Sequence, residues 1–290
     1  MFRIAALLAI APVMTGDLLT WPDLTKRPQP SADATLSYGP DQMQKVDVWL
    51  PAGKGPHPVV LMVHGGCWQT SIADRSLMNW IAADLRSEGI AVWNIDYRGI
   101  DRAGGGYPGT FADTAQAADL LTRNARRYHL DTRRVVAVGH SAGGHLALWL
   151  AARRKLPKDS PLAGGKPIRL ARVISLGGLP DLEATAASPD NGCGTEVVAK
   201  LVGTGRSDPY TDTSVPRLLP IGVRQDLVNG REDKIIPFRM ATAYAAAATR
   251  AGDTAALHTV PATGHVELVA PESAAWAETK RIIREGFADK

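Results

Sequence analysis

Residues 135–144 read VVAVGHSAGG, an apolar β-branched run that stops at a glycine and is followed within two residues by a serine. The run predicts a buried strand, and the apolar residues that continue to Leu150 predict a helix directly after it. A chain that passes from strand to helix in so few residues must turn sharply, which places the Ser141 side chain at the tip of the turn. The pattern G-x-S-x-G alone is weak evidence for a catalytic serine. Its place between the expected strand and helix makes Ser141 a candidate nucleophile.

The rest of the chain shows the same alternation of short apolar runs and helical stretches, which is typical of a parallel sheet covered by helices on both faces. The expected strands are 46–50, 59–63, 91–95, 135–138, 173–176, 226–228 and 257–260, and the expected helices are 76–87, 111–124, 142–152, 240–250 and 273–287. The fold class is therefore α/β, with a mostly parallel central sheet in three layers.

One long segment interrupts this alternation. Residues 177–222 are rich in Pro, Gly, Asp and Ser, and only 196–201 has a helical pattern. The segment is too long for an ordinary connection, and long excursions at the carboxyl edge of a parallel sheet build substrate pockets or lids. We therefore expect a small lid excursion here.

A serine hydroxyl needs a general base, and in strand–turn–helix sites the chain order is serine, acid, histidine. Two histidines lie well beyond Ser141. His258 lies inside the expected last strand, which favours a structural role. His265 lies in the loop after that strand, from which a base can reach the carboxyl edge of the sheet. The order along the chain therefore favours His265 as the base.

The acid is expected in a loop between Ser141 and His265. Asp233 follows Gly230 by three residues and precedes Ile236-Pro237, a spacing that lets a tight turn present its carboxylate. Its neighbour Glu232 and the earlier Asp181 are the alternatives. We predict Asp233 as the acid.

Acyl transfer also needs backbone N–H donors for the oxyanion of the tetrahedral intermediate. One donor is the amide of Ala142, directly after the nucleophile, and the others are expected in the loop HGGC after the 59–63 strand. Its glycines let the backbone approach a substrate closely, so we predict the amides of Gly66 and Cys67 as donors. In this interpretation Cys67 contributes its N–H and not its thiol. His64 would orient the loop, and His140 would fill its motif position without a role.

The two cysteines, Cys67 and Cys193, are too few for a disulfide-dense scaffold or a multi-cysteine metal site. A disulfide between them stays open if the protein is exported. No metal or cofactor motif occurs, so no cofactor is expected. The formal net charge is +4 and the basic residues are scattered without interleaved aromatics, which argues against nucleic-acid binding.

The apolar run 4–13 after Arg3 is long enough for a signal-peptide core and too short to span a bilayer, so no stable membrane insertion is expected. It predicts that residues 1–16 are a signal peptide and that the protein is periplasmic or secreted. Residues 14–16 are a poor cleavage site, so a cytoplasmic protein that starts at Met14 is the alternative. Residues 17–37 predict an extended lead-in.

Several motifs together resemble an α/β-hydrolase-fold serine esterase, closest to the group of BD-FAE-like esterases and kynurenine formamidase. They are HGGCWQ at 64–69, NIDYR at 94–98, GGYPGT at 105–110, GHSAGG at 139–144, the 230–237 loop and GHVEL at 264–268. The resemblance covers residues 38–287 and implies one α/β-hydrolase domain over 38–290. The family's nucleophile, acid and base fall on Ser141, Asp233 and His265. Residue 67 departs from it, because an aromatic often stands there.

The expected function is hydrolysis of carboxylic esters through a Ser-His-Asp triad and an acyl-enzyme, with a small-molecule acyl ester or amide as substrate. An arylformamidase is the nearest alternative, because both reactions use the same site. A peptidase or a non-catalytic binding protein on the same fold fits less well, since no large lid domain is evident and every triad candidate is present. Acyl specificity and oligomeric state stay open.

Overall fold

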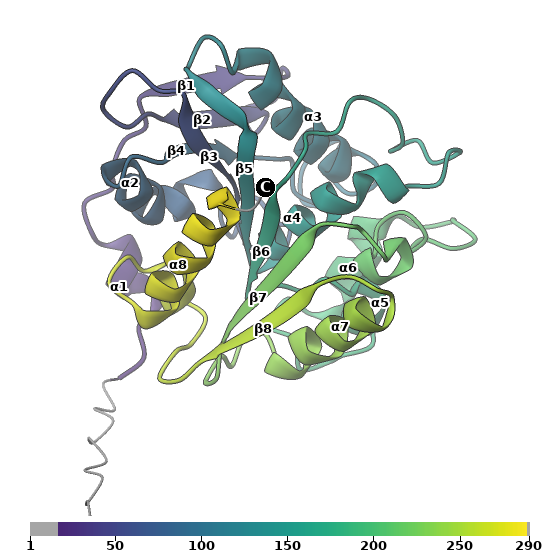
Figure 1. Cartoon of the computed structure of the whole chain (residues 1–290). Coiled ribbons are helices and arrows are strands. Elements are labelled where there is room, and N and C mark those ends of the chain that lie inside the picture. Colours follow the sequence, from purple (N-terminus) through teal and green to yellow (C-terminus); the bar gives the residue numbers. More distant parts are fainter. Residues whose placement is uncertain (1–16, 289–290) are drawn as a thin grey trace, which may run out of the picture.

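Eight strands form one sheet in the computed structural model, which describes residues 17–288, and their order is β1-β2-β4-β3-β5-β6-β7-β8 (Figure 1). The strands are β1 (Ala34–Ser37), β2 (Lys45–Trp49), β3 (His57–Val63), β4 (Ala91–Ile95), β5 (Leu130–His140), β6 (Arg172–Leu176), β7 (Arg224–Gly230) and β8 (Ala255–Val260). Strands β3 to β8 pair in parallel, whereas β1 and β2 are antiparallel. All seven expected strands are present, and the α/β class with a mostly parallel sheet is confirmed.

Helices cover both faces of this sheet. They are α1 (Trp21–Thr25), α2 (Asn79–Ser87), α3 (Gly109–Asn124), α4 (Ala142–Ala152), α5 (Leu182–Ala186), α6 (Thr195–Val202), α7 (Phe238–Arg250) and α8 (Ala274–Ala288). Four short 3₁₀ turns join them: η1 (Arg75–Met78), η2 (Arg153–Lys155), η3 (Val215–Leu218) and η4 (Glu267–Val269). Helices α1, α2 and α8 lie on one face of the sheet, and α3, α4 and α7 lie on the other (Figure 1).

The strands are continuously apolar because each face of the sheet packs against helices. On β3, Val59, Leu61 and Val63 belong to one buried cluster, and the residues between them, Val60 and Met62, belong to the other. Alternate side chains point to opposite faces of a strand, so a two-sided core requires apolar residues at every position.

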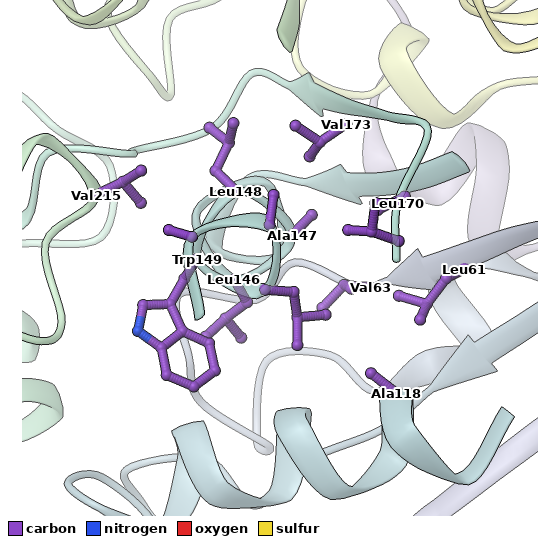
Figure 2. Packing of buried hydrophobic residues seen from close by; sticks show 14 of the residues in the cluster. Leu61, Val63, Ala118, Leu146, Ala147, Leu148, Trp149, Leu170, Val173 and Val215 are labelled. Carbon is purple, nitrogen blue, oxygen red and sulfur yellow. The ribbon is translucent and has the colours of Figure 1, made fainter. Parts of the chain in front are cut away.

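Helix α4 lies at the centre of the larger cluster. All eleven of its residues are buried, and Figure 2 shows Leu146 on the side of the helix that faces Val63 of β3. The Trp149 ring lies 5.1 Å from that of Phe111 in α3, between centroids. A helix that is apolar on all sides is stable only inside a core. Its amino end, and with it Ser141, is therefore fixed by the buried core.

The segment predicted as an extended lead-in is part of the folded domain. It contains α1 and the edge strand β1, which pairs with β2 between Ala34 and Ser37. Leu24 of α1 is fully buried against the cluster formed by α2 and α8. The prediction that the domain begins at residue 38 was therefore wrong, because one buried leucine in a polar, proline-rich stretch gives no periodic signal. The predicted signal peptide at 1–16 lies outside the described residues.

The predicted excursion at 177–222 is present and carries more structure than expected. Helix α6 corresponds to the predicted piece at 196–201, while α5 and η3 were missed because each is only one turn long. Val198, Leu201 and Val215 are fully buried and attach the excursion to the larger core cluster. The excursion therefore packs on the domain over much of its length.

We expect Leu24→Ala to lower the free energy of unfolding by about 2–5 kcal/mol, the usual cost of emptying a fully buried leucine site. Lys26→Ala, two residues on and exposed, is the matched control and should change it by less than about 0.5 kcal/mol. Urea unfolding of both variants measures the difference. Equal stabilities would show that α1 does not belong to the cooperative fold.

Candidate active site

The predicted site residues lie where the strand order reverses. The chain leaves β3 toward β4 on one side and returns to β5 on the other. In open α/β sheets, ligands bind beyond the carboxyl ends of the strands at such a point. The loop predicted to hold the oxyanion follows β3 at Val63, and Ser141 follows β5 at His140. Two segments more than seventy residues apart in the sequence therefore meet at one point.

Ser141 lies on a strained turn, as the sequence predicted. Its φ is 54° and its ψ is −122°, a conformation that non-glycine residues rarely adopt. Its N–H donates to the carbonyl of Leu176 at the end of β6, at 2.8 Å, and its carbonyl accepts the N–H of Gly144, also at 2.8 Å. The turn is thus held from the strand side and from the helix side.

Close backbone approach explains the glycines around the serine. A Cβ on Gly139 would lie 2.0 Å from the carbonyl oxygen of Gly143, and a Cβ on Gly143 would lie 2.2 Å from that of Val63. Neither contact is with a side chain that could move away. Only glycine therefore fits at these two positions.

His265 and Asp233 form a buried pair. Their Nδ1 and Oδ2 atoms are 2.7 Å apart, and the two side chains are 4% and 0% exposed. The other carboxylate oxygen accepts the N–H groups of Ile235 and Ile236 at 2.8 and 3.0 Å. Because a carboxylate only accepts, Nδ1 carries the proton in this contact and Nε2 of a neutral His265 is left as the acceptor.

The alternative acids have other partners. Asp181 is the N-cap of α5 and accepts the N–H of Ala184, while Glu232 accepts the N–H of Thr263. The alternative base, His258, lies on the edge strand β8 between Asp226 and Glu278. Of the three candidate carboxylates, Asp233 is the one that contacts the His265 ring.

The loop after β3 presents backbone amides beside Ser141. A Cβ on Gly65 would lie 3.0 Å from the Cβ of Ser141, so the loop backbone packs directly against the serine. Within residues 17–288, no carbonyl or side chain accepts the N–H of Gly66, Cys67 or Ala142. Unpaired amides at such a place are what an oxyanion requires.

Three consecutive residues of the same loop have positive φ angles, and two of them are not glycine. The φ angles of Gly66, Cys67 and Trp68 are 99°, 51° and 55°. Non-glycine residues in this region cost about 1–3 kcal/mol each and persist only where the surroundings impose them. Two backbone bonds contribute, from Gln69 N–H to the Gly66 carbonyl and from Ile100 N–H to the Trp68 carbonyl, both 2.8 Å long.

His64 holds the start of this loop, in line with the structural role predicted for it. Its Nδ1 lies 2.7 Å from the Gly65 carbonyl oxygen, and its Nε2 lies 2.8 Å from Oδ1 of Asp96. Arg75 donates to the other oxygen of Asp96 at 2.8 Å. The His64 ring stacks on Tyr97, whose hydroxyl donates to the His64 carbonyl at 3.0 Å.

The prediction that His140 only fills its motif position was wrong. Its ring lies 4.5 Å from that of His265, between centroids, and its Nε2 lies 3.2 Å from the His265 carbonyl oxygen. Burial and the neighbouring His265 lower the pKa of His140 well below its ordinary value, so the ring stays neutral. The sequence signal for a contact of His140 within the site was its position directly before Ser141.

The amino-terminal segment also reaches the His265 loop, which sequence reasoning missed. The Trp21 ring packs edge-on against His140 and His265, with centroids 6.0 and 6.3 Å apart. The Leu19 N–H donates to Glu267, whose second oxygen accepts the N–H of Gly264 at 2.9 Å. No pattern in the segment's proline-rich sequence indicates these contacts.

Cys67 and Cys193 form a disulfide, the alternative that the sequence left open. The bond joins the loop after β3 to the excursion across 126 residues of sequence. Disulfides persist in oxidising compartments. The sequence analysis left this disulfide open on the condition that the protein is exported. The Cys67 thiol is thus part of a crosslink.

Five arginines that are scattered in the sequence lie together at the end of the sheet opposite the predicted site. A cleft of about 970 Å³ lies beside the amino ends of β5 to β7 and holds none of the predicted site residues. Its arginines are Arg133, Arg134, Arg154, Arg169 and Arg224.

Within residues 17–288, no group of three His, Cys, Asp or Glu side chains is arranged to hold a metal ion. In the same range, no helix combines the length and the apolar character that crossing a bilayer requires.

The family profile of BD-FAE matches residues 46–245, which is more than half of the chain. Over 114 residues, the chain is 28% identical to an isoprenylcysteine α-carbonyl methylesterase of Arabidopsis thaliana, covering 39% of this chain and 26% of the relative. Over 120 residues, it is 28% identical to a kynurenine formamidase of Danio rerio, covering 39% and 36%. The chain therefore spans only about a quarter to a third of these relatives.

The fold itself is similar to that of a solved carbohydrate esterase from gut microbiota, in a truncated form. The TM-score is 0.75 at 19% identity, and the superposition covers 89% of this chain and 98% of the other. The expected α/β-hydrolase fold is therefore confirmed.

Stability should fall with acid because of His145, which lies on α4 between Trp68 and Phe111. Burial lowers its pKa to about 4, so below pH 6.5 the unfolded chain binds a proton that the folded chain does not. Between pH 7 and 5.5 this group should cost roughly 1 kcal/mol of unfolding free energy. Urea unfolding at both pH values measures it.

His145→Gln should reduce this loss without abolishing it, because His140 is also buried and neutral. A variant with the same pH dependence as the natural protein would contradict the assignment.

Proposed function

The chain belongs to the BD-FAE family of α/β-hydrolase-fold serine esterases, and on this basis we propose that it hydrolyses carboxylic esters with Ser141, His265 and Asp233 as a catalytic triad. The observation that carries the proposal is the 2.7 Å contact between buried His265 and Asp233 at the sheet edge where Ser141 lies on its strained turn. A strained serine and a buried ionisable pair both lower the stability of the fold, so their presence together is better explained by catalysis than by a structural role.

The proposed reaction begins when the Ser141 hydroxyl attacks the carbonyl carbon of the ester. Nε2 of His265 accepts the hydroxyl proton, and Asp233 holds the ring in the correct tautomer and stabilises its cation. The carbonyl oxygen becomes an oxyanion, which accepts hydrogen bonds from the amides of Gly66, Cys67 and Ala142. The alcohol leaves with the proton from His265, and an acyl group stays on the serine.

Water completes the cycle. His265 removes a proton from a water molecule, which attacks the acyl carbon, and the proton then returns to Ser141 as the carboxylic acid leaves. The sum is ester plus water to acid plus alcohol. An N-formyl aryl amide could follow the same path, and the similarity to the Danio rerio formamidase makes arylformamidase activity the second candidate.

The acid assignment predicts a sharp difference among three carboxylates. Asp233→Asn should lower kcat by about 10³–10⁴, since the amide cannot hold the required tautomer of His265. Glu232→Gln and Asp181→Asn are matched controls that remove the neighbouring and the alternative carboxylate, and each should keep kcat within about threefold. Steady-state hydrolysis of a p-nitrophenyl ester measures all three. A crippled Asp181→Asn with an active Asp233→Asn would refute the triad.

The substrate class is tested by direct comparison of short-chain p-nitrophenyl esters with N-formylkynurenine. We expect kcat/KM for the best ester to exceed that for the formamide, and Ser141→Ala to lose both activities. A preference for the formamide would replace the ester proposal by the second candidate. Activity retained in Ser141→Ala would refute both.

A further inference from the structure

One turn of the excursion contacts two of the loops that make up the proposed site. We name residues 188–194 the strap. The Gly192 N–H of the strap donates to the carbonyl of Ile235 at 2.7 Å, and the Ile235 N–H itself donates to Asp233. The next residue, Cys193, is bonded to Cys67 in the proposed oxyanion loop. The strap therefore links the loop of the acid to the loop of the proposed oxyanion donors.

The strap is internally fixed by Asn191, which is only 4% exposed. Its Nδ2 donates to the carbonyls of Thr185 and Ser188, at 3.0 and 2.5 Å. Its Oδ1 accepts the N–H of Cys193 at 3.0 Å. Because the amide side chain holds three backbone groups at once, the position of the Cys193 backbone is set from within the excursion.

The loop at the far end of the disulfide needs such support. Cys67 stands in the middle of three residues with positive φ, and its own N–H is one of the proposed donors. The backbone bonds that restrain the loop begin at Gly66 and Trp68 on either side of it. Within residues 17–288 no hydrogen bond has the Cys67 N–H as donor, so the disulfide is the direct tether of this residue to a neighbouring segment.

We propose that Cys193 is a positioning residue, which aims the Cys67 amide at the oxyanion through the disulfide. This inference rests on the proposed ester hydrolysis. A dithiol reductant would reverse the positioning: it donates two electrons, its own two sulfurs become a disulfide, and its two protons pass to Cys67 and Cys193 as thiols. The site would then keep its triad and lose the fixed direction of one donor.

The proposal predicts the same defect from every way of breaking the bond. Cys67→Ala, Cys193→Ala and the double variant each keep the amide at position 67, and each should lower kcat by about tenfold, less than the roughly 10²–10³ lost with a whole donor. The KM should stay within about twofold, since the donor acts on the transition state. The three losses should be equal and not additive, because the variants remove one link.

Reduction gives an independent test on the natural protein. Dithiothreitol should release two thiols per chain and reduce kcat to the level of Cys193→Ala, while the double variant should not respond. Arg217→Ala is the matched control, because it breaks an exposed ion pair with Glu183 in the same excursion and leaves the strap intact. Its kcat should be unchanged. All rates are taken well below the lowest Tm, with circular dichroism to show that each variant is folded.

Three results would overturn the proposal. A folded Cys193→Ala with the natural kcat would show that the disulfide positions nothing. A rise in KM alone would show that the strap shapes the pocket instead. A much larger loss in Cys67→Ala than in Cys193→Ala would show that the Cys67 sulfur takes part directly. Failure of the esterase proposal is recognised separately, because Ser141→Ala would then keep its activity.

Discussion

The turn at Ser141 exists because three backbone segments approach one another too closely for any side chain to stand between them. Gly143 lies against the carbonyl of Val63 at the end of β3, and Gly139 lies against the start of α4. The positive φ of Ser141 is maintained by this packing, with β6 on one side and a fully buried helix on the other. If the turn relaxed, the serine would leave its place at the carboxyl ends of β3 and β5, away from the other groups of the site.

The remaining groups stand on loops, and loops have few apolar contacts of their own to fix them. Each loop is instead held by a small number of specific bonds. The loop after β3 has His64 with its pair Asp96, and it has the disulfide to the excursion. The His265 loop has Glu267 and the edge of Trp21 from the amino-terminal segment. The excursion and the amino-terminal segment, which carry none of the proposed catalytic residues, thus help to fix the loops of the site.

Sequence reasoning succeeded where a pattern is local and failed where a residue acts through distant partners. The strands and Ser141 follow from apolar periodicity and from a glycine pattern in its context. The pair of Asp233 and His265 follows from chain order, and the structure brings the two side chains into contact. Trp21 carries no such signal, because its ring partners His140 and His265 are 119 and 244 residues away. Leu24 is the same case, because it is buried in a cluster with residues of α2 and α8.

His140 and the disulfide illustrate the same limit. The G-x-S-x-G motif includes His140 but does not indicate its contact with the carbonyl of His265. That contact forms only when the fold brings the end of β5 next to the His265 loop. The two cysteines permitted a bond, and only the packing of the excursion brings Cys193 to Cys67. Long-range contacts of this kind depend on the whole fold, so a short stretch of sequence cannot indicate them.

The most direct test of the account is the covalent intermediate itself. Rapid quenching of the reaction with p-nitrophenyl acetate, followed by peptide mass spectrometry, would locate any acetyl group on the chain. If Ser141 is the nucleophile, one acetyl group per chain appears on the peptide that contains Ser141, forms with the burst of p-nitrophenol and is lost during turnover. An acetyl group that turns over on another residue, or hydrolysis without an acylated Ser141 under conditions that give a burst, would contradict it.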